Sequence, residues 1–138
     1  MALRKNAKLE LLKQVPLFAG CSKRELEEIA KIADEIDFRE GKQLTREGAA
    51  GREFFVLVEG SAEVTKGKRK LRTMTDGDFF GEISLITRLP RTATVTTLSP
   101  VRALVVTDRS FRRLLENDGE IQRKVLSALG ERLDTAVP

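Results

Sequence analysis

The feature that most constrains the fold is a series of short β-favouring segments in the middle of the chain. From Ile36 to Val106, runs rich in Val, Thr, Phe and Leu recur at short intervals, and several end at a glycine. The runs are IDFREG, KQLTREG, REFFVLVEG, SAEVTKG, RKLRTM, TATVTTL and VRALVV. Strands this short and regularly spaced favour an antiparallel sandwich or barrel over parallel β/α units. We expect Gly60 and Gly67 to provide the positive φ of hairpin turns.

Helical patterns precede the β-favouring segments. An amphipathic segment runs from Leu9 to Leu12, and the sequence SKRE at Ser22 to Glu25 reads as a capping box, which starts a helix. The residues that follow repeat at the i, i+3, i+4, i+7 spacing of one buried helix face: Leu26, Ile29, Ala30 and Ala33. The sequence therefore predicts helices before the strands.

Helical patterns also follow the strands. Asp108 is the expected cap of a helix that carries Phe111, Leu114 and Leu115. Asn117 or Asp118 is the expected cap of a last helix, whose apolar residues are Ile121, Val125, Leu129 and Leu133. We expect this last apolar face to pack on the β-roll as core.

The length and order of these segments predict one domain. A chain of 138 residues is long enough for one core and short for two. The expected fold is mainly β with flanking α-helices, an antiparallel jelly-roll-like β-roll. We expect N-terminal helices over about 1–34, the β-roll over 35–107 and C-terminal helices over 108–134, all within a single domain of 1–138.

The composition excludes several kinds of site. The chain has no histidine, so the commonest general base and the commonest transition-metal ligand are both absent. Its single cysteine, Cys21, cannot form an intramolecular disulfide, and we interpret it as a partly buried or idle thiol. We therefore expect neither a metal site nor an enzyme, and a metal-dependent jelly-roll enzyme of the cupin type is nearly excluded.

The charge pattern does not favour nucleic acid. Lys and Arg number 25 against 21 Asp and Glu, and the net charge of +4 is spread along the chain. The densest basic run, KGKRK at Lys66 to Lys70, falls at an expected hairpin tip and has no interleaved aromatic residues for base stacking. We interpret it as a solvated turn, with no direct nucleic-acid partner.

No segment reads as a membrane span or a signal peptide. No apolar run approaches the roughly 18 residues that a span requires. The first residues, MALRKNAKLELLKQ, place charges where a signal peptide needs an uninterrupted apolar stretch. We expect a cytoplasmic protein.

The segment FGEISLITRLPRTATV, residues 80–95, carries the clearest functional signal. Glu82 follows a glycine, and Arg91 comes nine residues later in a stretch that is otherwise apolar or hydroxylic. A short helix before Pro90 would offer backbone N–H groups to an anion, and Arg91 would offer a fork for phosphate oxygens. Glu82 would repel phosphate but can accept hydrogen bonds from a sugar hydroxyl. The pattern predicts that the ligand is a nucleotide with a single negative charge. The alternative is that Glu82 and Arg91 form only an exposed ion pair.

The same segment resembles the phosphate-binding cassette of the cyclic nucleotide-binding domain family, which includes kinase regulatory subunits and catabolite activator proteins. The matching residues are Phe80, Gly81, Glu82, Ile83, Leu85, Pro90, Arg91, Ala93 and Val95. The resemblance also includes GDFFGE and the turn at Gly60, and the order of helices and β-roll agrees along nearly the whole chain.

The resemblance implies a role for each site residue. Glu82 would bind the ribose 2′-hydroxyl, and Arg91 the exocyclic phosphate oxygens. The amides of Gly81, Ile83 and Ser84 would add donors. Ser84 stands where many members have alanine, and Thr92 would face the phosphate or the base. Leu129, Arg123 or Arg132 of the last helix could cover the base.

The resemblance implies a sensor whose ligand shifts the C-terminal helices, with cAMP favoured over cGMP by its general use in bacteria. Thr92 leaves the choice of base open, because threonine or serine after the arginine occurs in both groups. A ligand-free protein-interaction domain of the same fold is the other alternative. The protein could be a stand-alone regulator or one domain of a larger kinase, channel, transferase or transcription factor, so an effector domain or protein partner is expected. Nothing in the sequence sets an oligomeric state.

Overall fold

The computed structural model describes residues 3–82, 84–87 and 89–136, with side chains as far as residue 131. Three helical segments come first: α1 (Lys5–Lys13), the 3-10 turn η1 (Pro16–Phe18) and α2 (Lys23–Lys31). Eight strands follow: β1 (Asp34–Phe38), β2 (Gln43–Thr45), β3 (Glu53–Glu59), β4 (Ala62–Lys66), β5 (Arg69–Met74), β6 (Phe79–Phe80), β7 (Thr94–Thr97) and β8 (Val101–Thr107). The short helix α3 (Ser84–Thr87) separates β6 from β7, and α4 (Asp108–Asn117) and α5 (Gly119–Ala136) end the chain.

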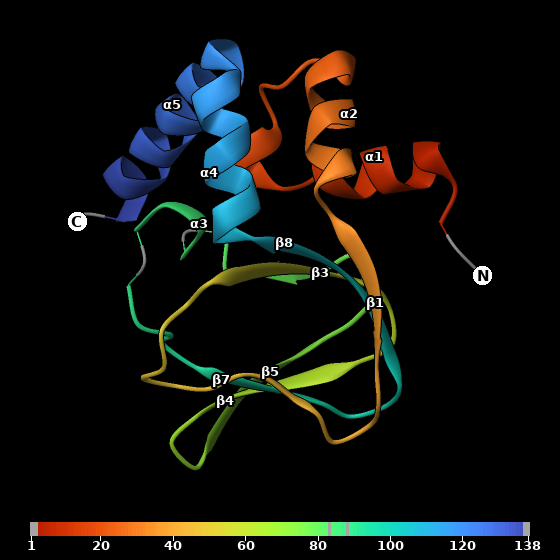
Figure 1. Ribbon diagram of the computed structural model, residues 1–138. Coiled ribbons are helices and arrows are strands. Elements are labelled where there is room, and N and C mark those ends of the chain that lie inside the picture. Colours follow the sequence, from red (N-terminus) through yellow and green to blue (C-terminus); the bar gives the residue numbers. More distant parts are fainter. Residues whose placement is uncertain (1–2, 83, 88, 137–138) are drawn as a thin grey trace.

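The strands form two antiparallel four-stranded sheets, in the orders β1–β8–β3–β6 and β2–β7–β4–β5. The helices lie as a layer over the first sheet, and the second sheet lies on the far side of the roll (Figure 1). This arrangement confirms the predicted β-roll with helices at both ends. The two-residue strand β6 is absent from the predicted runs because it is too short to show a period of two.

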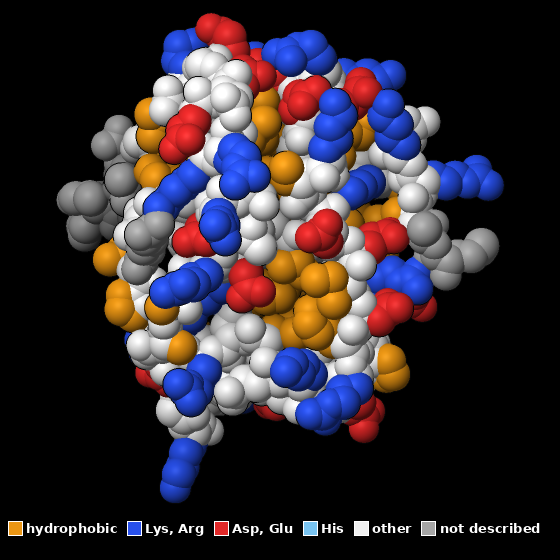
Figure 2. Space-filling view, in the orientation of Figure 1, with side chains coloured by type: hydrophobic (Ala, Val, Ile, Leu, Met, Phe, Trp, Pro, Cys, Tyr) orange, Lys and Arg blue, Asp and Glu red, His pale blue; other side chains and the backbone are white. Residues whose placement is uncertain are grey.

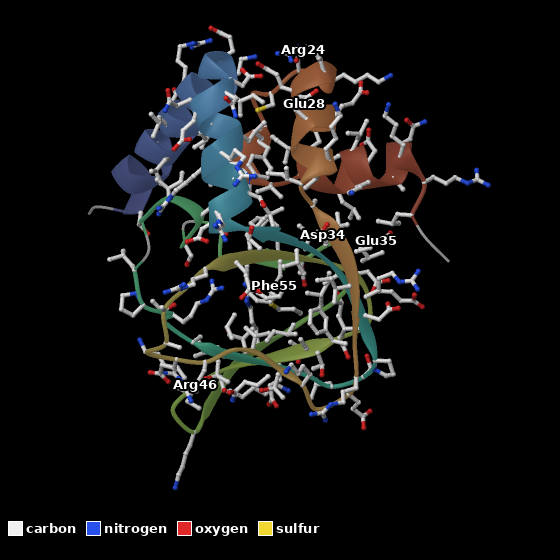
Figure 3. All side chains as sticks on the ribbon, viewed as in Figure 1. Arg24, Glu28, Asp34, Glu35, Arg46 and Phe55 are labelled. Carbon is white, nitrogen blue, oxygen red and sulfur yellow. The ribbon has the colours of Figure 1, made fainter. Side chains whose placement is uncertain are left out.

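The core consists of two apolar clusters on opposite faces of the first sheet. Phe54 and Val56 of β3 belong to the cluster beneath the helices, and Leu57 belongs to the cluster between the sheets. Phe55 also lies between the sheets, where its ring stacks on Phe80 at a centroid distance of 4.8 Å (Figure 3). Both faces of β3 are therefore buried, which explains why its sequence FFVLV is continuously apolar.

The helical layer is anchored by its caps. The capping box predicted at Ser22 and Glu25 is present, with the Ser22 side chain accepting from the Glu25 amide and the Glu25 side chain accepting from the Ser22 amide. The predicted cap of α4 was wrong by one residue. Thr107 caps α4 by accepting from the Ser110 amide, and Asp108 is the first helical residue.

The last helix, α5, begins at one of the two caps that the sequence predicts. Asp118 caps this helix by accepting from the Ile121 amide. The helix packs mainly against η1 and α4. Its residues Ile121, Val125 and Leu129 belong to the core cluster beneath the helices, which also contains Phe54 and Val56 of β3, so this face is part of the core as predicted. Leu133 lies outside the residues whose side chains are described.

Gly60 has the predicted positive φ of 108°, but it does not form a hairpin. The strands on its two sides, β3 and β4, belong to different sheets. A Cβ atom at Gly60 would lie 2.5 Å from the Pro100 carbonyl oxygen, so this glycine allows a tight crossing between sheets. Gly67 does turn the hairpin of β4 and β5, as predicted.

Cys21 is half-buried in the helical layer, and burial raises the pKa of its thiol. Within the described residues, no helix is long and apolar enough to cross a membrane.

Candidate ligand-binding site

Residues 80–95 form one wall of a cavity of about 640 Å³ beside the second sheet. Strands β4 and β5 add apolar side chains from outside this segment, Val64 and Met74. The polar side chains around the cavity are Thr45, Arg72, Asp78, Glu82, Ser84, Thr87, Arg91 and Thr92. Apolar walls with a few convergent polar groups are typical of small-molecule sites.

Arg91 is held in the cavity wall by two hydrogen bonds. Its Nη2 atom donates to the Glu53 carbonyl oxygen at 2.5 Å, and its Nη1 atom donates to the Ser84 hydroxyl at 3.2 Å. The side chain is half-buried, and burial lowers the pKa of Arg91 while the Glu53 carboxylate opposes this. Arginine keeps its charge in proteins, so a fixed positive charge lies in the wall.

The backbone around Arg91 is fixed by the loop between β2 and β3. The Arg91 amide donates to the Ala49 carbonyl, and the Gly48 amide donates to the Arg91 carbonyl, both at 2.8 Å. An isolated β-bridge joins Ala50 to Pro90 in the same place. Arg91 therefore enters the cavity from a paired backbone although it lies outside the named strands.

Two glycines give the arginine its space. Gly81 has a φ of +86°, and a Cβ atom there would lie 2.5 Å from Arg91 Nη1 and 2.8 Å from the Glu53 carbonyl oxygen. A Cβ atom at Gly51 would lie 2.6 Å from the Ser84 hydroxyl. Any larger residue at either position would collide with the group that positions Arg91.

The other site residues expected from the sequence fall around the same cavity. The Glu82 side chain is only 6% exposed and lines the cavity. Thr92 is exposed at its edge, and Ser84 accepts the bond from Arg91. The Ser84 amide donates to the Gly81 carbonyl at 3.1 Å. Ile83 lies outside the described residues.

Glu82 and Arg91 therefore do not resemble an exposed surface ion pair. One of the two side chains is buried, the other is half-buried, and both line one cavity. Burying a charged group is costly unless it is paired and hydrogen-bonded, so these two positions differ from a solvated surface pair.

Several cavity residues were not predicted as site residues. Arg72 and Asp78 lie outside the 80–95 segment, and the Glu53 carbonyl is 38 residues from Arg91. The run RKLRTM was predicted as a strand, but only the register of that strand with β4 shows which side chains face the cavity.

Two of the three residues suggested as a lid, Leu129 and Arg123, do not line the cavity. Among the described residues that line it, none belongs to α5. Leu129 packs in the helical cluster, and Arg123 pairs with Glu120 at 3.0 Å on the same helix. The Arg132 side chain lies outside the described part of the chain.

Residues 35–118 match the family model described as the cyclic nucleotide-binding domain. The chain belongs to the cyclic nucleotide-binding domain family. This match includes β1 except for Asp34, all of β2 to β8, the segment 80–95 and α4. It confirms the resemblance stated from the sequence.

Relatives in this family include regulatory proteins of kinases. The chain is 38% identical to a cAMP-dependent protein kinase regulatory subunit of Mycosarcoma maydis, over 77% of this chain and 22% of that protein. It is 34% identical to the cGMP-dependent protein kinase, isozyme 1, of Drosophila melanogaster, over 84% of this chain and 16% of that protein. The chain thus spans about a fifth of the length of these curated relatives.

A solved structure of the same fold is the N-terminal domain of a transcriptional regulator from Streptomyces coelicolor A3(2). It superposes with a TM-score of 0.84 at 26% identity, over 92% of this chain and 94% of that chain. The chain is therefore similar both to parts of kinases and to part of a transcriptional regulator.

Proposed function

We propose that this chain is a regulatory module that binds a cyclic nucleotide, preferentially cAMP, in the cavity beside residues 80–95. The observation that carries the proposal is the pairing, in one cavity, of the positioned Arg91 with the buried Glu82. Arg91 would bind the cyclic phosphate, which carries a single negative charge. Glu82 would accept a hydrogen bond from the ribose hydroxyl, and the apolar lining would cover the sugar and base.

Binding would change the partners of Arg91. In the described structure its guanidinium donates to a carbonyl and a hydroxyl, which are neutral acceptors. A phosphate would add charge-assisted hydrogen bonds, each worth roughly 1.5 to 3 kcal/mol. The module would bind and release its ligand without chemistry, so cAMP incubated with it should be recovered intact.

The test is calorimetric titration with cAMP and, separately, with cGMP. Arg91→Ala should weaken binding by more than about tenfold, because one such bond is worth that factor. The matched control is Arg69→Ala, an exposed arginine at the start of β5, which should leave affinity unchanged. Circular dichroism would check that both variants fold. Unchanged affinity in Arg91→Ala would overturn the assignment of Arg91, and no binding of either nucleotide would favour the ligand-free interaction domain.

Two other observations bear on whether the base of the nucleotide is adenine or guanine. Relatives named as cAMP-dependent regulatory subunits favour cAMP. Arg72, however, lines the cavity from β5, and an arginine fork matches the O6 and N7 acceptors of guanine. Adenine carries an amino group at the corresponding edge and would not accept both bonds. This observation supports cGMP as the second candidate.

The same titration separates the two nucleotides when it is repeated on Arg72→Ala. If Arg72 reads guanine, the variant should lose cGMP affinity about tenfold and keep its cAMP affinity within about twofold. Equal affinities before and after the substitution, for both ligands, would remove Arg72 from base selection.

We further propose that ligand occupancy reaches the C-terminal helices. Leu85 of α3 is fully buried in the cluster that contains Phe54 of β3 and Phe111 of α4. A shift of α3 would therefore repack the contact with α4, and α4 packs on α5. Amide hydrogen exchange with and without nucleotide should show altered protection in α4 and α5 as well as in 80–95, and a change confined to 80–95 would argue against transmission. The cytoplasmic location stays a prediction.

A further inference from the structure

A second cavity, of about 650 Å³, lies where α4 begins, beside the loop between β2 and β3. Its charged lining consists of Arg52, Arg109, Arg112, Arg113, Asp108 and Glu116. Figure 2 shows Lys and Arg side chains along the position that α4 has in Figure 1, with Asp and Glu side chains between them. The cavity therefore has four positive and two negative side chains.

The helix sequence explains why the arginines gather there. Phe111 is fully buried, and Leu114 and Leu115 pack against the same cluster. The remaining positions of the amphipathic helix then face outward, and Arg109 and Arg113 lie one turn apart. Like charges at this spacing destabilise a helix by a few tenths of a kcal/mol. A merely solvated helix face accounts for these arginines but not for Arg52, which reaches the same hollow from another element.

The arginines keep their charges available. Within the described residues, no ion pair joins Arg52, Arg109 or Arg113 to a carboxylate, and the side chains of all three are exposed. Elsewhere in the molecule, exposed basic residues such as Lys5 and Arg123 do pair with acids. The lining of the second cavity thus carries a net positive charge, with four arginines against Asp108 and Glu116.

The walls of the cavity are held together before any partner binds. The Asp108 amide donates to the Arg52 carbonyl at 2.8 Å, which ties the start of α4 to the loop. The Thr107 side chain caps the helix at the same place. The backbone around the cavity is therefore already ordered, and little free energy would be lost in ordering it when a partner binds.

We propose that this cavity docks an acidic segment of a partner protein. Carboxylates of such a segment would pair with the arginines, and its backbone N–H groups would donate to Glu116. A nucleic-acid strand fits less well, because no aromatic side chain among the described lining residues offers a stacking surface for bases. The proposal goes beyond cyclic nucleotide binding and does not depend on it.

The test measures binding of a fluorescein-labelled octaglutamate peptide by fluorescence anisotropy at low salt, with octaglutamine as the uncharged probe. Arg109→Gln with Arg113→Gln should weaken octaglutamate binding by at least about tenfold, since two charge-assisted contacts are lost. The matched control is Arg46→Gln with Arg69→Gln, which removes the same charge from exposed positions on the second sheet. Arg46 lies far from α4 (Figure 3), and the control should weaken binding by less than about twofold.

Three outcomes would overturn the proposal: no octaglutamate binding by the unaltered chain, equal losses in the two double variants, or tighter binding of an oligothymidine through the same arginines. Equal losses would show an effect of net charge alone. The last outcome would make the surface a nucleic-acid site. All four positions are exposed, so we expect each variant to fold. Thermal unfolding of each variant checks that a loss of affinity does not come from a loss of fold.

Discussion

The nucleotide cavity and the α4 cavity are nearly equal in volume, about 640 and 650 Å³, but their charged side chains differ in number and in burial. In the nucleotide cavity one half-buried arginine is fixed by a carbonyl and a hydroxyl, and one acid is buried nearby. In the α4 cavity four arginines gather, and three of them are exposed. Volume alone therefore does not distinguish these sites.

The difference suggests two kinds of recognition. A few buried, positioned groups favour a small ligand of defined shape, because their interactions are strong in a low dielectric and depend on geometry. Several exposed charges favour a flexible charged segment, and their attraction is screened by salt. We expect octaglutamate binding to fall steeply with ionic strength and cyclic nucleotide binding to change much less.

Gly81→Ala is expected to give the largest difference between the two cavities in ligand affinity. The added Cβ would lie 2.5 Å from Arg91 Nη1 and 2.8 Å from a backbone oxygen, so Arg91 would have to leave its position. Cyclic nucleotide affinity should fall roughly 100-fold or more, which corresponds to losing about two charge-assisted bonds. Octaglutamate binding at the α4 cavity should stay within about twofold. Titration of both probes measures the two effects.

The control for Gly81→Ala is Gly41→Ala. Gly41 has a similar φ of 78°, but a Cβ there would meet nothing within 4 Å. Both variants carry the strain of a left-handed backbone, about 1 to 2 kcal/mol, and only Gly81→Ala adds the collision. If both variants lost the same nucleotide affinity, strain and not the position of Arg91 would be responsible.

A smaller effect is expected from Gly51→Ala, because Gly51 lines the α4 cavity but lies close to Ser84 and Arg91 of the nucleotide cavity. The new Cβ would lie 2.6 Å from the Ser84 hydroxyl and 3.2 Å from Arg91 Cδ. Because the hydroxyl can rotate away, we expect a loss of about three- to tenfold in nucleotide affinity. Adding Ser84→Ala removes the oxygen and should restore part of it. A double variant no better than Gly51→Ala alone would show that the Arg91 side chain is what the new methyl group displaces.

The sequence predicted the parts of the molecule that depend on local patterns. The capping box at Ser22 and the buried helix face that follows need only neighbouring residues, and both are confirmed. Residues 80–95 carry their glycine, acid, proline and arginine in one continuous stretch, so the segment was recognisable without a structure. The family match agrees with that interpretation.

The parts that were missed depend on residues distant in the chain. Gly60 was expected in a hairpin, because sequence alone does not say that β3 and β4 join different sheets. The carbonyl of Glu53 that holds Arg91 is invisible in the sequence, since every residue has a carbonyl. Arg72 reaches the cavity only through the register of β5 with β4. The α4 cavity likewise needs the loop of Arg52 to lie against the helix.

The smallest effect on either cavity is expected from Glu25, which tests stability apart from ligand binding. Glu25 is 3% exposed and accepts from Lys124 Nζ at 2.6 Å, linking α2 to α5. This bond, together with the Ser22 amide, lowers the pKa of Glu25 to about 2. Its unfolded pKa is about 4.3, so its contribution to stability is complete above that pH and is lost as the pH falls towards 2.

Glu25→Gln should therefore lower the free energy of unfolding at neutral pH by about 1 to 3 kcal/mol and flatten its decline between about pH 5 and pH 3. The control Glu28→Gln, on the same helix, removes only the exposed pair with Lys31 and should cost less than about 0.5 kcal/mol. Thermal unfolding followed by circular dichroism across this pH range measures both. Because Glu25 lines neither cavity, both probes should bind Glu25→Gln within about twofold of the unaltered chain. A large loss at the nucleotide cavity alone would show that the α2–α5 link already acts on that site, and the two cavities would then differ in their coupling to the helices as well as in their charge.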